Sequence, residues 1–155
     1  MERIPEPELM NEEAQARAYA EADFAEPHDR FVTLFGEIFP RLALPGPVLD
    51  LGCGPADITL RFARAHPRCR IDGVDGAEAM LRLGREAVAS EGLGARVRLV
   101  HGYLPGAHLP RRRYEAVISN SLLHHLADPL VLWQTVAAHA EAGAPVFVMD
   151  LMRPD

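Results

Sequence analysis

A glycine-rich turn with an acid beside it is the first place where this sequence indicates ligand chemistry. In VLDLGCGPADITLRFA (48–63), Asp50 comes just before Gly52, Cys53 and Gly54. Glycines let the backbone turn tightly and approach a ligand, and the N-terminus of a following helix attracts a carboxylate or phosphate. Asp50 favours an ammonium or hydroxyl instead. A ligand with both charges, such as an amino-acid moiety, satisfies both, although a tight turn without a ligand is an alternative.

A second carboxylate, Asp75, follows in GVDGAEAML. An acid about 20 residues beyond a glycine turn, at the next strand end, is placed to accept hydrogen bonds from ribose hydroxyls. The alternative is that Asp75 only caps a helix. Gly76 and Ala77 are small enough for a flat ring to lie beside them, and Met80 can supply apolar contact. A dinucleotide is disfavoured because Asp57 stands where the dehydrogenase pattern needs its third glycine.

The third stretch is SNSLLHHLADP (119–129), where Ser119 and Asn120 end a predicted strand and Leu122, His124 and His125 follow. Either histidine can contact a substrate, or both are partly buried residues at the start of a helix. Adjacent histidines point apart in a helical turn and no third ligand is evident, so we predict no metal site.

These residues need a framework of alternating strands and helices. The pattern predicts strands at 48–51, 69–75, 96–101, 114–119 and 145–151. Helices between them and an apolar face of Leu130, Trp133, Ala137 and Ala140 in the last one imply a parallel sheet. Before them, helices are expected to start at Asn11 and Pro27. We predict a single domain, made of an N-terminal arm with two helices (1–43) and an α/β core (44–155).

Composition limits the function classes. The chain has 155 residues, a formal net charge of -6, 48% hydrophobic and 25% charged residues, which fits one globular domain. An acidic chain does not attract nucleic acid, and we interpret the basic run 111–113 as a solvated turn. No apolar run approaches the roughly 20 residues that span a membrane. Two cysteines and a polar, acidic N-terminus favour a cytoplasmic protein.

Four segments, in order over residues 48–152, resemble the class I S-adenosylmethionine-dependent methyltransferases: VLDLGCGPADITLRFA, IDGVDGAEAML, RLVHGYLP and YEAVISNSLLHHLADP. The resemblance implies a Rossmann-like, doubly wound parallel sheet of order 3-2-1-4-5. It implies S-adenosylmethionine as cofactor, with S-adenosylhomocysteine as product. The glycine turn would hold the methionine part, Asp75 the ribose, and Gly76, Ala77 and Met80 the adenine. Residues 119–122 would border the methyl donor, and Tyr19 and Phe24 would belong to a lid.

The sequence departs from the family pattern in two places. Where the family often has glycine and then an aspartate that bonds the adenine, this chain has Gly102 and Tyr103. The sequence also stops after the fifth strand, where the family usually continues with two more. Either the sequence is a shortened one, or another chain covers the apolar edge, and such an edge favours a homodimer.

The resemblance implies methyl transfer to a small molecule that the sequence does not identify. Such a displacement needs mainly alignment and exclusion of water, and His124 is our candidate for a base if the acceptor carries a proton. The alternative from another class is a non-catalytic S-adenosylmethionine-binding or degenerate module that acts through protein contacts.

Overall fold

The computed structural model describes residues 12–151, which form a five-stranded parallel sheet. The strands are β1 (Pro47–Leu51), β2 (Arg70–Asp75), β3 (Val97–His101), β4 (Ala116–Asn120) and β5 (Val146–Met149), in the order β3-β2-β1-β4-β5. Each neighbouring pair is parallel. The predicted Rossmann-like sheet and its strand order are therefore confirmed.

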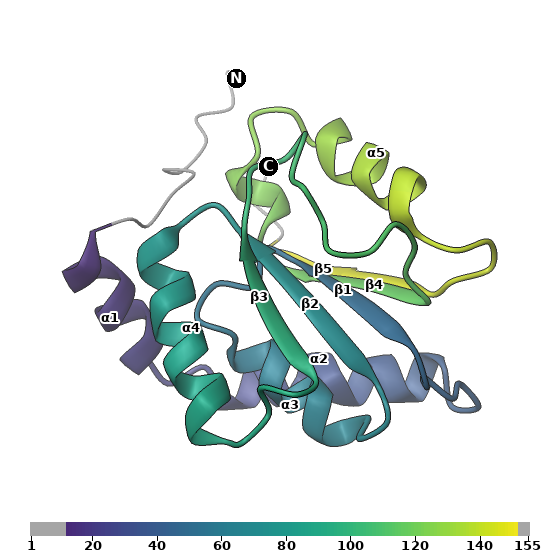
Figure 1. Ribbon diagram of the computed structural model, residues 1–155, viewed down its shortest axis with the longest axis horizontal. Coiled ribbons are helices and arrows are strands. Elements are labelled where there is room, and N and C mark those ends of the chain that lie inside the picture. The colour runs from purple at the N-terminus through teal and green to yellow at the C-terminus, as the bar shows by residue number, and fades with distance from the viewer. Residues whose placement is uncertain (1–11, 152–155) are drawn as a thin grey trace.

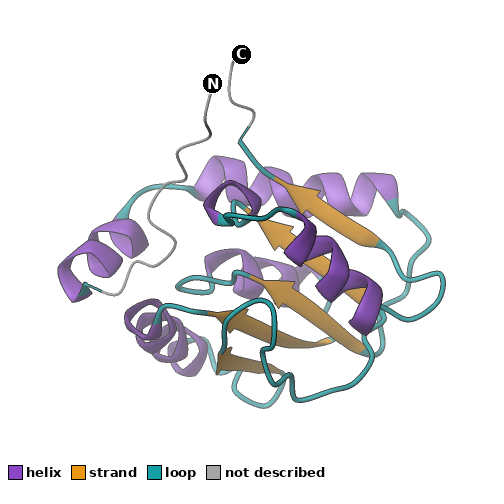
Figure 2. Ribbon diagram, turned by 90° about the horizontal axis from the view of Figure 1, so that it is seen from above, coloured by secondary structure: helices purple, strands orange, loops and turns teal. Residues whose placement is uncertain are grey.

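Helices cover both faces of the sheet. They are α1 (Glu13–Glu21), α2 (Ala25–Ile38), α3 (Asp57–Ala65), α4 (Glu78–Ser90), the short 3₁₀ helix η1 (Leu123–His125) and α5 (Leu130–His139). Figure 1 shows α2 and α3 below the sheet and α5 above it, and Figure 2 shows the strand arrows layered between the helices. The strand order reverses between β1 and β4, where such folds open a ligand crevice.

The central strand β1 explains why the core has two halves. Val48 and Leu49 are both fully buried, but they belong to different clusters because successive side chains of a strand point to opposite faces. Val48 packs with Phe31, Phe35 and Phe62 of α2 and α3, and Leu49 packs with the cluster that contains Leu132 of α5. The sheet is thus fixed from both sides, and its strand ends are held in place.

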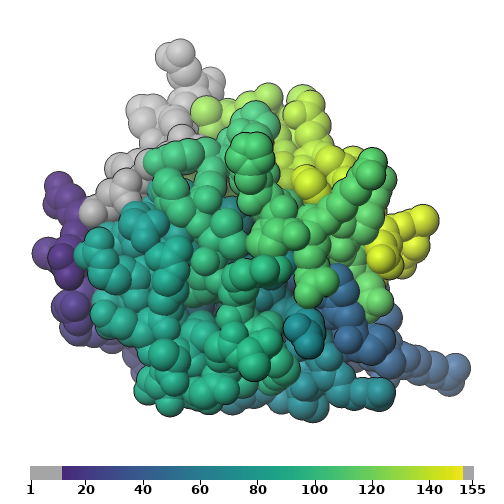
Figure 3. Space-filling view, in the orientation of Figure 1, coloured from purple at the N-terminus to yellow at the C-terminus, as the bar shows by residue number. Residues whose placement is uncertain are grey.

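The N-terminal helices differ in detail from the prediction. Asn11 lies outside the described residues, and α1 begins at Glu13. Helix α2 begins at Ala25, two residues before Pro27, because the Asp23 side chain accepts a hydrogen bond from the Ala25 N–H at 3.1 Å. In the space-filling view α1 lies at the rim beside α4 (Figure 3), where Ala16 is buried against small residues of α4 and the segment before it.

Two predictions outside the site are wrong. The buried residue of α5 is Leu132, while Leu130 and Trp133 of the predicted face are 60% and 44% exposed. The basic run is not wholly solvated either, since Arg111 lies 3.7 Å from the buried Asp72. The Tyr114 hydroxyl also donates to Asp72, at 2.8 Å. No helix among residues 12–151 is long and apolar enough to cross a membrane.

Candidate functional site

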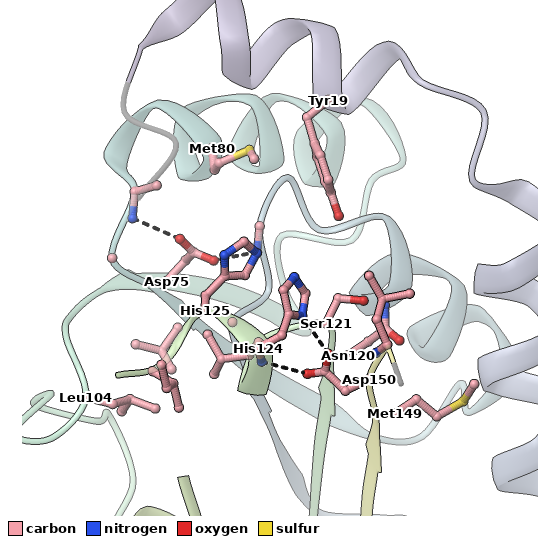
Figure 4. A pocket seen from close by; sticks show the side chains of 18 of the residues that line it. Tyr19, Asp75, Met80, Leu104, Asn120, Ser121, His124, His125, Met149 and Asp150 are labelled. Atoms are coloured by element: carbon pink, nitrogen blue, oxygen red, sulfur yellow. Dashed lines mark hydrogen bonds and ion pairs between the residues drawn. The ribbon is translucent and has the colours of Figure 1, made fainter. Parts of the chain in front are cut away.

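A cavity of about 520 Å³ lies at the carboxyl ends of the strands. Residues of β2, β4 and β5 and the segments that follow β1 and β3 form its wall, together with α1, α2 and the start of α4 (Figure 4). It brings together most of the residues that the sequence singled out: Tyr19, Phe24, Gly52, Gly54, Asp75, Gly76, Ala77, Met80, Gly102, Tyr103, Asn120, Leu122, His124 and His125.

Three of the predicted residues, Asp50, Cys53 and Ser119, do not line this cavity. Their side chains are buried beneath it. The Ser119 hydroxyl donates to the Leu51 carbonyl at 2.8 Å, which ties β4 to β1. The Cys53 thiol is buried in the turn, and burial followed by the nearby Asp50 and Asp75 raises its pKa well above the ordinary value. These residues shape the site from below.

Asp50 is an acid held inside the protein. It is 3% exposed and accepts a hydrogen bond from the Thr59 hydroxyl of α3 at 2.6 Å. Burial raises the pKa of Asp50 to about 7, against the opposing effect of the Thr59 hydrogen bond. Burial therefore favours the neutral form of this carboxyl group over the charged one.

The glycine turn is tied to β2 by its own backbone. The N–H groups of Gly52 and Cys53 both donate to the Val74 carbonyl, at 2.8 and 3.1 Å. The Gly54 N–H donates to an Asp75 carboxylate oxygen at 2.8 Å. We expected N–H groups near this turn to bind a ligand anion, but those of the turn itself hold β1 to β2.

Gly52 is the position in the turn that needs glycine most. Its φ of +74° lies in the left-handed region, and a Cβ there would come within 2.9 Å of the Leu122 side chain. The glycine thus lets the segment after β4 approach the turn after β1. Gly52 and Leu122 therefore lie side by side in the wall of the cavity.

Asp75 presents a fixed carboxylate to the cavity. One oxygen accepts from Gly54 and the other from the Ala77 N–H, also at 2.8 Å. Burial raises its pKa, and these two hydrogen bonds act against that rise. A carboxylate oxygen has two acceptor directions, so each oxygen keeps one for a ligand. Two adjacent hydroxyl groups fit this arrangement.

His124 and Asp150 form a pair that the sequence did not predict. His124 Nδ1 lies 2.5 Å from Asp150 Oδ1, and the two side chains are 11% and 12% exposed. The ring of His125 lies next to that of His124, with centroids 4.0 Å apart. In Figure 4 the two histidines lie between Asp75 and Asp150. The signal for Asp150 was its place at the end of the fifth strand, which matches that of Asp75 in the second.

The predicted lid contributes a row of aromatic rings. Phe24 lies between Tyr19 and His28, with ring centroids 5.1 and 5.4 Å away. His28, which the sequence analysis missed, lines the cavity and has its Nδ1 2.5 Å from an Asp57 oxygen. Burial raises the Tyr19 pKa, and the negative charges of Asp75 and Asp57 raise it further. The Tyr19 hydroxyl group reaches from α1 into the site (Figure 4).

The segment that follows β3 contains Tyr103, the residue that stands where the family often has an aspartate. Gly102 and Tyr103 line the cavity, and the Tyr103 side chain is 52% exposed. Its ring lies nearly perpendicular to the His101 ring, at a centroid distance of 5.2 Å. Tyr103 therefore offers an aromatic surface where the family often has a carboxylate. Ser121, within the predicted stretch 119–122, also lines the cavity. Other lining residues that the sequence analysis did not select are Pro27, Val74, Leu104, Leu126, Met149 and Leu151.

Comparison with known proteins decides the family. The model of the methyltransferase domain family matches residues 48–143, which include the turn, Asp75 and both histidines. The chain belongs to the class I S-adenosylmethionine-dependent methyltransferases. An uncharacterized methyltransferase of Mycobacterium tuberculosis is 30% identical over 107 residues, which cover 69% of this chain and 51% of that protein. The chain thus spans about half the length of the curated relatives it matches.

Solved structures show the same fold. A protein of Methanococcus maripaludis assigned to the S-adenosylmethionine-dependent methyltransferases superimposes with a TM-score of 0.77 at 16% identity, over 94% of this chain and 66% of that one. A phosphoethanolamine N-methyltransferase of Haemonchus contortus, in complex with S-adenosyl-L-methionine, gives 0.69 at 20% identity, over 77% and 27%. At these identities the likeness concerns the fold alone.

Proposed function

We propose that this methyltransferase binds S-adenosylmethionine across the cavity and transfers its methyl group to a small-molecule acceptor. The observation that carries the proposal is the Asp75 carboxylate, which faces a mostly apolar cavity with both oxygens anchored by backbone N–H groups. A buried carboxylate is stabilised by further hydrogen-bond donors. The two hydroxyl groups of a ribose supply such donors in adjacent positions.

The residues around Asp75 fit the rest of the nucleoside. Gly76, Ala77 and Met80 leave room and apolar contact for the adenine on one side, and Tyr103 offers a ring at the rim. The central floor at Gly52 and Leu122 would then hold the methionine part, with Asn120 as a polar partner. Bound there, S-adenosylmethionine supplies a methyl group on a positively charged sulfur. The protein aligns the acceptor with it and keeps water away.

The lid completes this arrangement. Tyr19 and Phe24 lie over the cavity from α1 and the start of α2, and the Phe24 ring rests on His28. His28 is in turn fixed to Asp57 of α3. We propose that these rings cover the bound cofactor and exclude water from the transfer.

Calorimetry with S-adenosylmethionine and S-adenosylhomocysteine tests the proposal. We expect both to bind the wild type and Asp75→Asn to weaken binding by about 30-fold or more, because hydrogen bonds to a charged group contribute about 1.5–3 kcal/mol each. The matched control is Glu86→Gln, an exposed carboxylate of α4, which should bind like the wild type. Absence of binding to the wild type would refute the proposal. Binding without transfer to a broad panel of acceptors would favour the non-catalytic module.

A further inference from the structure

The amino-acid part of the cofactor carries a carboxylate, and the glycine turn does not supply a partner for it. In the placement proposed above, this part lies over the turn after β1. The N–H groups of residues 52–54 all donate to acceptors of β2 instead. Among the described residues that line the cavity, none is a lysine or an arginine. A histidine is then the side chain that can bring a positive charge to the carboxylate.

Of the three histidines in the described lining, His28 is the one beside the glycine turn. Its Nδ1 lies 2.5 Å from an oxygen of Asp57, and Asp57 begins α3 three residues after Gly54. The other two histidines belong to the segment after β4 and lie between Asp75 and Asp150 (Figure 4). His28 is therefore the histidine at the amino-acid end of the ligand.

The His28 ring has one nitrogen that a ligand can reach. The side chain is only 10% exposed, because the Phe24 ring stacks on it and Nδ1 meets Asp57. Burial alone would raise the pKa of Asp57, but hydrogen bonds from Arg61 and His28 lower it. Asp57 is thus a carboxylate, which only accepts, so Nδ1 carries the hydrogen. Among residues 12–151 nothing bonds Nε2, which stays accessible at the cavity wall.

We propose that protonated His28 binds the α-carboxylate of S-adenosylmethionine, so that cofactor binding is coupled to the uptake of a proton. The inference rests on the proposed function above. In the neutral ring Nε2 has a lone pair and no hydrogen, so it repels a carboxylate oxygen. A proton from solvent bonds to this lone pair, and the new N–H donates to the carboxylate. No bond of the cofactor breaks in this step.

The charges around His28 favour the protonated ring when a carboxylate is bound. Asp57 also accepts from Arg61 at 2.8 Å, and Arg61 reaches Asp29 of α2 at 2.6 Å. With His28 protonated these four groups are neutral together, and without the proton they carry one negative charge. A ligand carboxylate is repelled by the second state and not by the first. Other titratable groups line the cavity or lie beneath it and enter any pH profile: Tyr19, Asp50, Cys53, Asp75, Tyr103, His124, His125 and Asp150.

Calorimetry with two ligands tests the coupling in the wild type. One ligand is S-adenosylhomocysteine, and the other is its decarboxylated form, which keeps the nucleoside and the amino group. At about pH 5.5, below the ordinary pKa of histidine, S-adenosylhomocysteine should bind at least about tenfold more tightly. Because only the protonated ring binds the carboxylate, this advantage should disappear as pH rises through the titration of His28.

Proton uptake gives a second readout that needs no variant. The same titrations in buffers of different ionisation enthalpy measure how many protons the protein takes up on binding. Near pH 7 we expect S-adenosylhomocysteine to take up more protons than the decarboxylated ligand, by up to one. A histidine that only supports the lid would give equal uptake for the two ligands.

Variants then assign the proton to His28. His28→Phe keeps a ring but has no nitrogen, so it should bind both ligands with equal affinity and equal proton uptake. Its affinity for the decarboxylated ligand should stay within about threefold of the wild type, which also shows that it folds. The matched control is His108→Phe, an exposed histidine outside the cavity lining, which should behave like the wild type. Asp57→Asn removes the charge that stabilises the protonated ring, so the carboxylate advantage should disappear at a lower pH.

The outcomes separate this inference from the proposed function. A wild type that binds both ligands equally at every pH, with equal proton uptake, overturns the inference alone. A carboxylate advantage that persists in His28→Phe does the same. If that variant binds neither ligand, the two wild-type measurements decide. A wild type that binds neither ligand overturns the proposed function and this inference with it.

Discussion

Replacing Asp50 by asparagine should make the protein more stable at alkaline pH. The carboxyl group is 3% exposed, and burial raises its pKa from the ordinary 3.8 to about 7. Asparagine has nearly the same shape, and its carbonyl can still accept the hydrogen bond from Thr59. It differs mainly in having no charge to bury.

The magnitude follows from the two pKa values. A folded-state pKa above the unfolded one means that the folded protein holds the proton more tightly, so stability falls as pH rises from about 4 through about 7. A rise of about 3 in pKa, at about 1.36 kcal/mol each, corresponds to about 4 kcal/mol lost by the wild type once Asp50 ionises. Asp50→Asn avoids this loss and should gain about 4 kcal/mol relative to the wild type between acidic and alkaline pH.

Urea unfolding of both proteins across this pH range measures the difference directly. Asp57→Asn is the control of opposite sign. Burial alone would raise the pKa of Asp57, but hydrogen bonds from Arg61 and His28 lower it below the ordinary value. The ionised Asp57 therefore stabilises the folded protein above the pKa it has in the unfolded chain, and this stabilisation is lost as pH falls through its pKa in the folded protein. A difference between wild type and Asp50→Asn that does not change with pH would refute the reasoning.

Three further predictions concern the turn, the core and the lid. Gly52→Ala should lower the free energy of unfolding by about 1–3 kcal/mol in urea titrations, because alanine is strained at a φ of +74° and its Cβ would lie 2.9 Å from the Leu122 side chain; unchanged stability would argue against this turn geometry. Tyr114→Phe should cost about 1–3 kcal/mol in the same assay, since it removes a 2.8 Å hydrogen bond to a buried carboxylate. Phe24→Ala should speed the dissociation of S-adenosylhomocysteine in stopped-flow measurements, because its ring bridges two others over the cavity; an unaltered rate would remove Phe24 from the lid.

The sheet could be predicted from the sequence because its signals are local. Strand ends, glycines and acids follow one another at fixed spacing, and parallel strands bring their carboxyl ends to one edge. That Asp75 and the two histidines line one cavity could therefore be expected from position alone. The face of α5 was not, because LVLWQTVAAH is apolar on nearly every side. Which side is buried depends on the sheet that the helix packs against, and the sheet selects Leu132.

The pairing of side chains was also beyond the sequence. Asp150 lies 26 residues after His124, and only the parallel pairing of β4 with β5 brings them together. His28 meets Asp57 in the same way, through the packing of α2 on α3. Asp50 is at a strand end like Asp75, but its side chain points into the protein and bonds Thr59. A residue's place along a strand does not reveal which acids remain accessible.

The hydrogen bond from the Gly54 backbone to Asp75 links two segments 21 residues apart at the point where a ligand would lie across both. Adenosine alone and homocysteine alone would each meet only one of these segments, yet both should sense the loss of this link. If the proposed placement holds, cutting this link by Asp75→Ala should weaken the binding of homocysteine as well as that of adenosine, although homocysteine would not reach residue 75. The segments after β1 and β2 would then act as one unit, and a change in either would affect the binding of both parts of the molecule.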